Sequence, residues 1–188
     1  MPRLSPASHP SWWIRLLLWF QKRSYGQTLE PVRVWAHSPG LLRRFLGFQK
    51  TLERKGSPLS PALRALVTVQ VSRIHHCDFC MDFNSHRVLQ REKDAEIKLE
   101  DLNHFETSDC FSDQEKVALA YTERVVRPDL KVDDDLFERL RAHFSEPGIV
   151  ELTALIGLQA LSASFNASLD IPAQGLCKYP INSDTRNG

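Results

Sequence analysis

Hydrophobic and polar residues follow one another along this chain with the period of an α-helix. Apolar positions recur at intervals of three and four residues, which places them on one helical face. The stripe after residues 60–61 is typical and consists of Leu63, Leu66, Val67, Val71 and Ile74. Runs that alternate strictly between polar and apolar residues, the pattern of a half-buried strand, are nearly lacking. The pattern therefore predicts an all-α bundle.

Helix start and stop signals divide the chain into segments. Serine followed by proline, at residues 38–39 and 60–61, is typical of an N-cap with a first-turn proline. Ser112 and Glu115 have the spacing of a capping box. These signals predict the following helical segments: 12–20, 30–37, 39–56, 61–74, 77–91, 94–105, 112–126, 133–144 and 149–168. The last segment is apolar on nearly every side, which favours a central position.

The length of 188 residues suits one domain with a single hydrophobic core. No linker rich in glycine, serine or proline divides the middle of the chain. We assign residues 30–171 to this domain, residues 1–29 to an N-terminal amphipathic helix extension, and residues 172–188 to a C-terminal tail.

The N-terminal extension contains the apolar run WWIRLLLWF at residues 12–20. This run is under half of the roughly 20 residues that a membrane span needs, and Arg15 interrupts it. Residues 11–23 either lie on a membrane surface or pack against protein. We favour protein, because helices with an apolar stripe are usually covered by it. The apolar surface of this helix and of the last one predicts a homo-oligomer, a dimer or a multiple of one.

The charge balance argues against a nucleic-acid partner. The chain has 24 basic and 23 acidic residues, a formal net charge of +1, and no nucleic-acid-binding motif. Its four cysteines are too few for a secreted disulfide scaffold, so we expect a cytoplasmic protein.

The clearest candidates for reactive residues are Cys77 and Cys80, in the run HHCDFCMDFNSH at the start of a predicted helix. One helical turn brings two such sulfurs within bonding reach. A helix N-terminus stabilises the thiolate, which is the reactive form. The pair is therefore a candidate redox dithiol, although two buried structural cysteines would also fit the spacing. A zinc site is disfavoured because neither a second CxxC nor a spaced histidine pair accompanies this one.

The residues around the pair resemble the carboxymuconolactone decarboxylase superfamily, and within it the redox branch of the alkylhydroperoxidase D type. The likeness covers about residues 30–175 and includes VRVWAHSPGLLRRFLGF, FSDQEKVALAYTERVV and VDDDLFERLRAHFSEPGIVELTALIGL. It implies an all-helical fold that assembles as dimers, trimers or hexamers. It also implies a peroxidase without metal or cofactor, in which Cys80 attacks a hydroperoxide and Cys77 resolves the product as a disulfide. A lipoyl or other dithiol protein would then reduce the pair.

The chain departs from the redox branch at two positions. That branch has a glutamate twelve residues before the first cysteine and a histidine four residues after the second, whereas this chain has Ala65 and Asn84. Alanine cannot move a proton, and an asparagine donates a hydrogen bond without acting as a base.

Some nearby residues are better placed than others to replace the missing proton-transfer groups. His76, and less so His75, precede the helix where a side chain can fold over the thiols. His86 and Asp82 point away from the thiols by helical geometry. We take Cys80, Cys77, His76 and Asn84 as the catalytic candidates.

Three functions remain. A thiol-dependent peroxidase is favoured by the intact CxxC. A non-redox enzyme of the superfamily, which acts on lactones or related compounds without cysteines, is the first alternative. An oligomeric binding protein that has lost the proton relay is the second.

Overall fold

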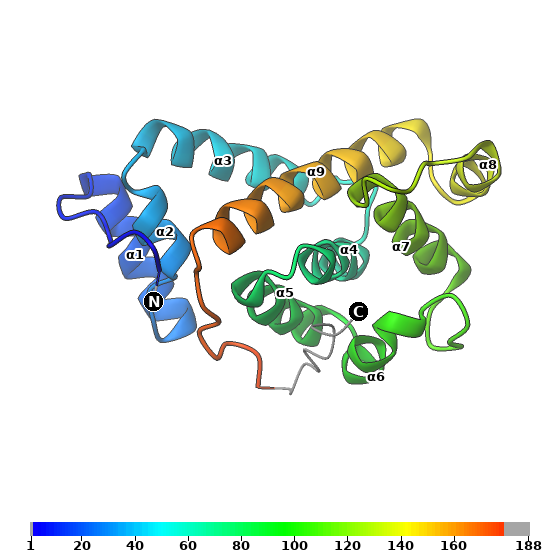
Figure 1. The fold of residues 1–188 in the computed structure, drawn as a ribbon, viewed down its shortest axis with the longest axis horizontal. Coiled ribbons are helices and arrows are strands. Elements are labelled where there is room, and N and C mark those ends of the chain that lie inside the picture. The colour runs from blue at the N-terminus through cyan, green and yellow to red at the C-terminus, as the bar shows by residue number, and fades with distance from the viewer. Residues whose placement is uncertain (1, 179–188) are drawn as a thin grey trace.

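The computed structural model describes residues 2–178, and these residues form nine α-helices, one short 3-10 helix and no strand (Figure 1). The helices are α1 (Trp12–Tyr25), α2 (Glu30–Trp35), α3 (Pro39–Leu52), α4 (Pro61–Ile74), α5 (Asp78–Arg91), α6 (Ala95–Glu100), α7 (Asp113–Val126), α8 (Asp134–His143) and α9 (Glu146–Ser168). The 3-10 helix η1 (Asp101–His104) follows α6 directly. The predicted all-α fold is confirmed.

Local signals in the sequence set several helix starts. The Ser60 hydroxyl accepts a hydrogen bond from the backbone N–H of Leu63 at the start of α4. Ser112 and Glu115 form a complete capping box at the start of α7. Each of these contacts satisfies backbone N–H groups that have no partner inside the helix.

The most deeply buried helix is α4, which packs against α5, α7 and α9. The apolar composition of α9 led us to expect that helix at the centre. In the structure α9 crosses the whole bundle and contacts α3, α4, α5, α7 and α8 on one side (Figure 1). Its other side is exposed at Val150, Thr153, Gly157, Leu161 and Ser164. Among the described helices α9 alone is long and apolar enough to span a membrane.

The N-terminal helix α1 is partly integrated into the domain. Ile14 is completely buried, in one hydrophobic cluster with Cys77, Cys80 and Ala163. The outer side of α1 is open, because Trp12 is 76% and Trp19 55% exposed. The helix therefore covers the thiol region with one face and presents aromatic rings with the other.

The segment after α9 is held along α5 by a buried carboxylate. The oxygens of Asp82 accept hydrogen bonds from the backbone N–H groups of Gln174, at 2.7 Å, and Cys177, at 2.6 Å. The described part of the predicted tail is therefore attached to the domain, while residues 179–188 lie outside the described residues.

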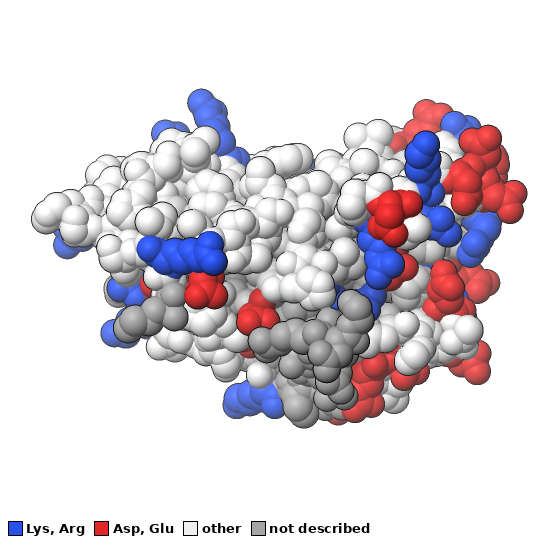
Figure 2. Space-filling view, viewed as in Figure 1, with Lys and Arg blue, Asp and Glu red and all other residues white. Residues whose placement is uncertain are grey.

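Charged side chains are unevenly distributed over the face in Figure 2. They gather over α6, α7 and α8, whereas the surface over α1, α2 and α3 is mostly uncharged with isolated charged side chains. The sequences of α1 and α3 contain no acidic residue at all.

Candidate functional site

A disulfide joins Cys77 and Cys80 where α4 gives way to α5. His76 has a φ of 51°, in the left-handed region, and so turns the chain sharply between the two helices. Cys77 is the N-cap of α5, and its sulfur accepts a hydrogen bond from the backbone N–H of Cys80 at 3.2 Å. The Cα atoms are 5.2 Å apart. The turn therefore brings both sulfurs to the positive end of α5.

Both cysteines are buried, Cys77 to 1% and Cys80 to 2% exposure. Cys80 lines a cavity of about 340 Å³, large enough for a small organic molecule. Cys77 is not among the residues that line it. The cavity therefore gives a ligand access to the Cys80 side of the pair.

The cavity wall is mainly apolar and comes largely from the first three helices. Its side chains include Leu17, Phe20, Val32, Trp35, Phe45 and Leu46. Trp35 lies stacked between Phe45 and Phe165, with ring centroids 5.4 Å and 4.0 Å away. Because α1 supplies part of this wall, the N-terminal extension contributes to the site.

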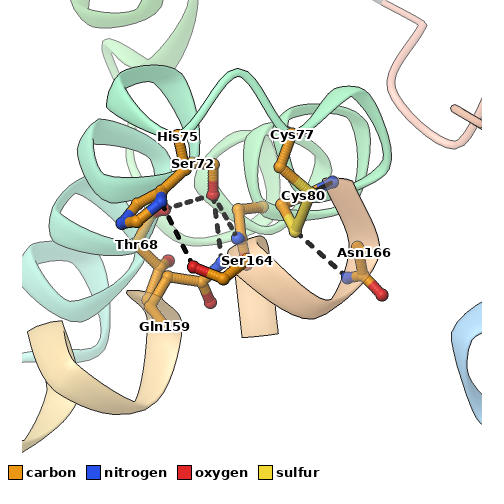
Figure 3. The surroundings of a disulfide bond; sticks show 9 residues. Thr68, Ser72, His75, Cys77, Cys80, Gln159, Ser164 and Asn166 are labelled. Atoms are coloured by element: carbon orange, nitrogen blue, oxygen red, sulfur yellow. Dashed lines mark hydrogen bonds between the residues drawn. A yellow bond between two sulfur atoms is a disulfide. The ribbon is translucent and has the colours of Figure 1, made fainter. Parts of the chain in front are cut away.

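Polar groups reach the cavity from the inner side of α9. Asn166 donates a hydrogen bond from Nδ2 to the Sγ of Cys80 at 3.2 Å (Figure 3). Its side-chain oxygen Oδ1 is buried and has no hydrogen-bond partner among the described residues. Ser162 and Gln159 line the same cavity, about one and two helical turns before Asn166.

A second cluster of polar side chains surrounds the hydroxyl of Ser72. This hydroxyl donates a hydrogen bond to the backbone oxygen of Thr68. The Ser72 Oγ accepts a hydrogen bond from Gln159 Nε2 at 3.1 Å (Figure 3). It accepts another from Asn84 Nδ2 at 3.0 Å. The Oδ1 of Asn84 accepts from Arg87 Nη1 at 3.4 Å. Asn84 is therefore held inside a network at the cavity wall, where its amide is engaged by Ser72 and Arg87.

Glu53 and Arg87 form another part of the wall, and two further arginines pair with the same carboxylate. Glu53 pairs with Arg87, with Arg91 at 3.2 Å and with Arg64 at 3.8 Å. Burial alone would raise the pKa of Glu53, but the positive charges of these arginines together hold it below its ordinary value. The ion-pair cluster therefore carries more positive than negative charge.

The histidines before α5 lie away from the cavity. His76 is exposed at the surface. The ring of His75 points towards Ser164, with 3.5 Å between Nδ1 and the Ser164 Oγ, and away from the disulfide (Figure 3). Burial, and next the charge of His76, lower the pKa of His75, which favours the neutral form of its ring. The structure thus does not bring His76 into the polar network beside Cys80, and a role for it stays a prediction.

The remaining sequence candidates are placed as follows. Ala65 is fully buried in a hydrophobic cluster with Leu66, Val69 and Val88, and it does not line the cavity. Asp82 binds the C-terminal segment, while His86 contacts the ring of Tyr25 and the amide of Gln90.

Sequence reasoning missed Asn166 and Gln159. A signal was present, because Gln159, Ser162 and Asn166 are polar residues at helical spacing in the mainly apolar second half of α9. Their distance of about 80 residues from the CxxC concealed the connection. The described residues also hold no group of three His, Cys, Asp or Glu side chains suited to a metal ion.

Known proteins share this sequence and fold. The uncharacterised protein YnjA of Escherichia coli (strain K12) is 42% identical over 177 residues, which are 94% of this chain and 97% of that protein. A crystal structure of an uncharacterised peroxidase-related protein with an alkylhydroperoxidase AhpD core, from Ralstonia eutropha JMP134, matches with a TM-score of 0.81 at 19% identity and covers 92% of each chain. The debrominase Bmp8 matches with a TM-score of 0.76 at 19% identity and covers 87% of each chain.

Residues 39–124, which run from α3 into α7 and include both site cysteines, match the model of the carboxymuconolactone decarboxylase family. The helical arrangement is shared with the AhpD-like structures. The chain belongs to the carboxymuconolactone decarboxylase family.

Proposed function

We propose that the protein is a thiol-dependent peroxidase that reduces organic hydroperoxides with Cys80 and Cys77. The observation that carries this proposal is a bonded CxxC of which one sulfur, that of Cys80, lies at the wall of an apolar cavity. Cys80 is the cysteine that a substrate in the cavity meets, so it is the one that attacks.

The reaction has an oxygen-transfer step, a disulfide-forming step and a final reduction. The Cys80 thiolate attacks the terminal oxygen of ROOH, the O–O bond breaks, and Cys80 becomes a sulfenic acid while RO⁻ takes a proton from water and leaves as the alcohol. The Cys77 thiol then attacks the Cys80 sulfur, which forms the disulfide and releases water. A dithiol of the lipoyl type reduces the disulfide and is itself oxidised.

The wall of the cavity supports an organic substrate rather than hydrogen peroxide. Its side chains from α1, α2 and α3 are predominantly aliphatic and aromatic. Burying an apolar substituent against them contributes about 25 cal/mol for each Å² removed from water. Hydrogen peroxide has no such substituent.

The test is consumption of cumene hydroperoxide with dihydrolipoamide as the reductant. Cys80→Ser is expected to abolish turnover. Without dihydrolipoamide, Cys77→Ser is expected to consume at most one equivalent, because no second thiol resolves the sulfenic acid. Cys110→Ser serves as the matched control and keeps full turnover, since Cys110 lies in another part of the fold, beside Ser108. Turnover that survives Cys80→Ser would refute the peroxidase and favour a non-redox enzyme, whereas an inactive wild type would favour a binding protein.

A second candidate is thiol-dependent removal of halogen from an aromatic ring. The rings around Trp35 offer a stacking surface for a flat substrate. The fold is shared with the debrominase Bmp8, and a cysteine-to-alanine variant of that protein was crystallised in complex with 2,3,4-tribromopyrrole. The balanced reaction turns an aryl bromide and two thiols into the reduced ring, a disulfide, bromide and a proton. Bromide release from tribromopyrrole in the same assay tests it.

A further inference from the structure

Asn166 combines two properties beside the reactive sulfur. It is 1% exposed, and its Nδ2 group lies 3.2 Å from the Sγ of Cys80, to which it donates. Among the described residues no cationic side chain donates a hydrogen bond to that sulfur. The Asn166 amide is therefore the side-chain group that can stabilise a negative charge on it.

The other end of the same amide has no partner. The Oδ1 atom of Asn166 is buried without a hydrogen bond among the described residues. A buried acceptor without a hydrogen bond destabilises the fold. Because Asn166 lines the cavity together with Cys80, a ligand in the cavity can supply the missing donor.

We propose that Asn166 is a catalytic residue, which stabilises the Cys80 thiolate through Nδ2 and holds the O–H group of a hydroperoxide through Oδ1. The second role rests on the proposed peroxidase function, whereas the first does not.

The chemistry of oxygen transfer suits an amide. In the attack described above, the terminal oxygen moves to sulfur with its hydrogen still attached, because the product on Cys80 is S–OH. The group that orients this O–H must therefore accept a hydrogen bond without removing the proton, which is what a side-chain carbonyl does. A hydrogen bond from Nδ2 becomes charge-assisted, and about twice as strong, once Cys80 is a thiolate.

Asn84 is less suited to stabilise the thiolate or to hold the O–H group of a hydroperoxide. Its amide nitrogen donates to Ser72, and its oxygen accepts from Arg87. Asn166 has an acceptor that no described residue occupies. This chain thus has an amide from α9 beside Cys80. It lacks the glutamate and the histidine that the redox branch has at the positions of Ala65 and Asn84.

The first measurement is alkylation of Cys80 by iodoacetamide as a function of pH, followed by mass spectrometry in a Cys77→Ser background. Asn166→Leu removes the donor at similar volume, and Asn166→Asp keeps the shape but places a negative charge beside the sulfur. We expect the midpoint of alkylation to move to higher pH in Asn166→Leu and further in Asn166→Asp. At pH 7 the rate should fall by about tenfold or more, the effect of one charge-assisted bond.

The second measurement is the rate of Cys80 oxidation by cumene hydroperoxide at a pH above both midpoints. There the thiolate is fully formed in each protein, so a remaining deficit of about tenfold in Asn166→Leu reports the loss of the Oδ1 acceptor. Ser164→Ala, an exposed position on the same helix, is the matched control and should change neither rate.

An alkylation profile of Asn166→Leu and Asn166→Asp that coincides with that of the parent protein overturns the proposal, whatever the wild type does with peroxides. A shifted profile without a peroxide-specific deficit refutes the Oδ1 role. A shifted profile in a protein that consumes no hydroperoxide supports thiolate stabilisation by Asn166 and refutes the proposed peroxidase alone.

Discussion

Ala65 is a single residue whose surroundings decide which proton path is open. Its side chain is fully buried among Leu66, Val69 and Val88, and Thr68, not Ala65, lines the cavity beside Cys80. A carboxylate at residue 65 would therefore enter an apolar cluster. Burial of an unpaired charge is among the few changes that destabilise a protein severely.

We predict that Ala65→Glu lowers stability by about 3 kcal/mol or more, a loss of roughly 6–12 °C in Tm for a protein of this size. It should leave peroxide turnover no higher, even when combined with Asn84→His. Ala142→Glu, at an exposed position of α8, is the control and should melt within about 2 °C of the wild type. Calorimetry and the cumene hydroperoxide assay measure both effects. A stable Ala65→Glu protein with faster turnover would show that residue 65 does reach Cys80.

Among single residues, the sequence predicted those parts of the site that are close to one another along the chain. Cys77 and Cys80 are neighbours along one helix, so their spacing alone indicates that the sulfurs meet. Asn166 meets Cys80 only because α9 packs across α5, and no local pattern encodes that contact. His76 was a reasonable candidate by proximity in sequence, yet the backbone turn at that residue leaves it exposed.

Among the elements, α3, α4 and α5 are joined by one acidic residue. Glu53, directly after α3, pairs with Arg64 of α4 and with Arg87 and Arg91 of α5. Because the arginines lower its pKa in the folded protein, the carboxylate stabilises the fold at pH values above its ordinary pKa of 4.5. This stabilisation is lost as the pH falls through the lower, folded-state pKa.

Glu53→Gln should therefore be less stable than the wild type at pH 7, by on the order of 2 kcal/mol, because three arginines lose their counter-charge. Between about pH 5 and pH 3 the wild type should lose Tm more steeply, so that the two curves converge. Thermal melts across this range, followed by circular dichroism, measure the effect. Parallel curves for the two proteins would mean that Glu53 has the same affinity for a proton in the folded and unfolded states.

Helix boundaries were predictable to the extent that side chains encode them. The capping box before α7 and the serine before α4 place those helices well. The segment predicted as one helix over residues 94–105 is divided into α6 and η1, and α9 begins at Glu146 rather than Ile149. The apolar pattern of α9 indicated burial but did not reveal that one of its sides would face outwards.

For the whole molecule, the exposed side of α9 bears on assembly. This side contains Val150, Thr153, Gly157, Leu161 and Ser164, all uncharged, on the longest of the described helices. A Cβ atom added at Gly157 would meet no other atom within 4 Å. The surface is therefore smooth and open in one copy, which suits close packing against a second.

We predict that the protein is a homo-oligomer, a dimer or a multiple of one, and that Gly157→Arg reduces its mass towards that of the 21.5 kDa monomer. The arginine has room in one copy but blocks a close approach of another helix. Gly47→Arg, at a helical glycine of α3 that also has open space, is the control and should not change the mass. Light scattering at micromolar concentration measures all three proteins. A monomeric wild type would contradict the prediction outright.

The cavity is built from two kinds of sequence. The stretch that matches the family, residues 39–124, carries the dithiol, whereas α1 and α2 before it supply much of the apolar wall. Substitutions between residues 12 and 35 reshape the chamber while the redox pair keeps its turn and its helix. The choice of substrate and the redox chemistry therefore depend on different stretches of this chain.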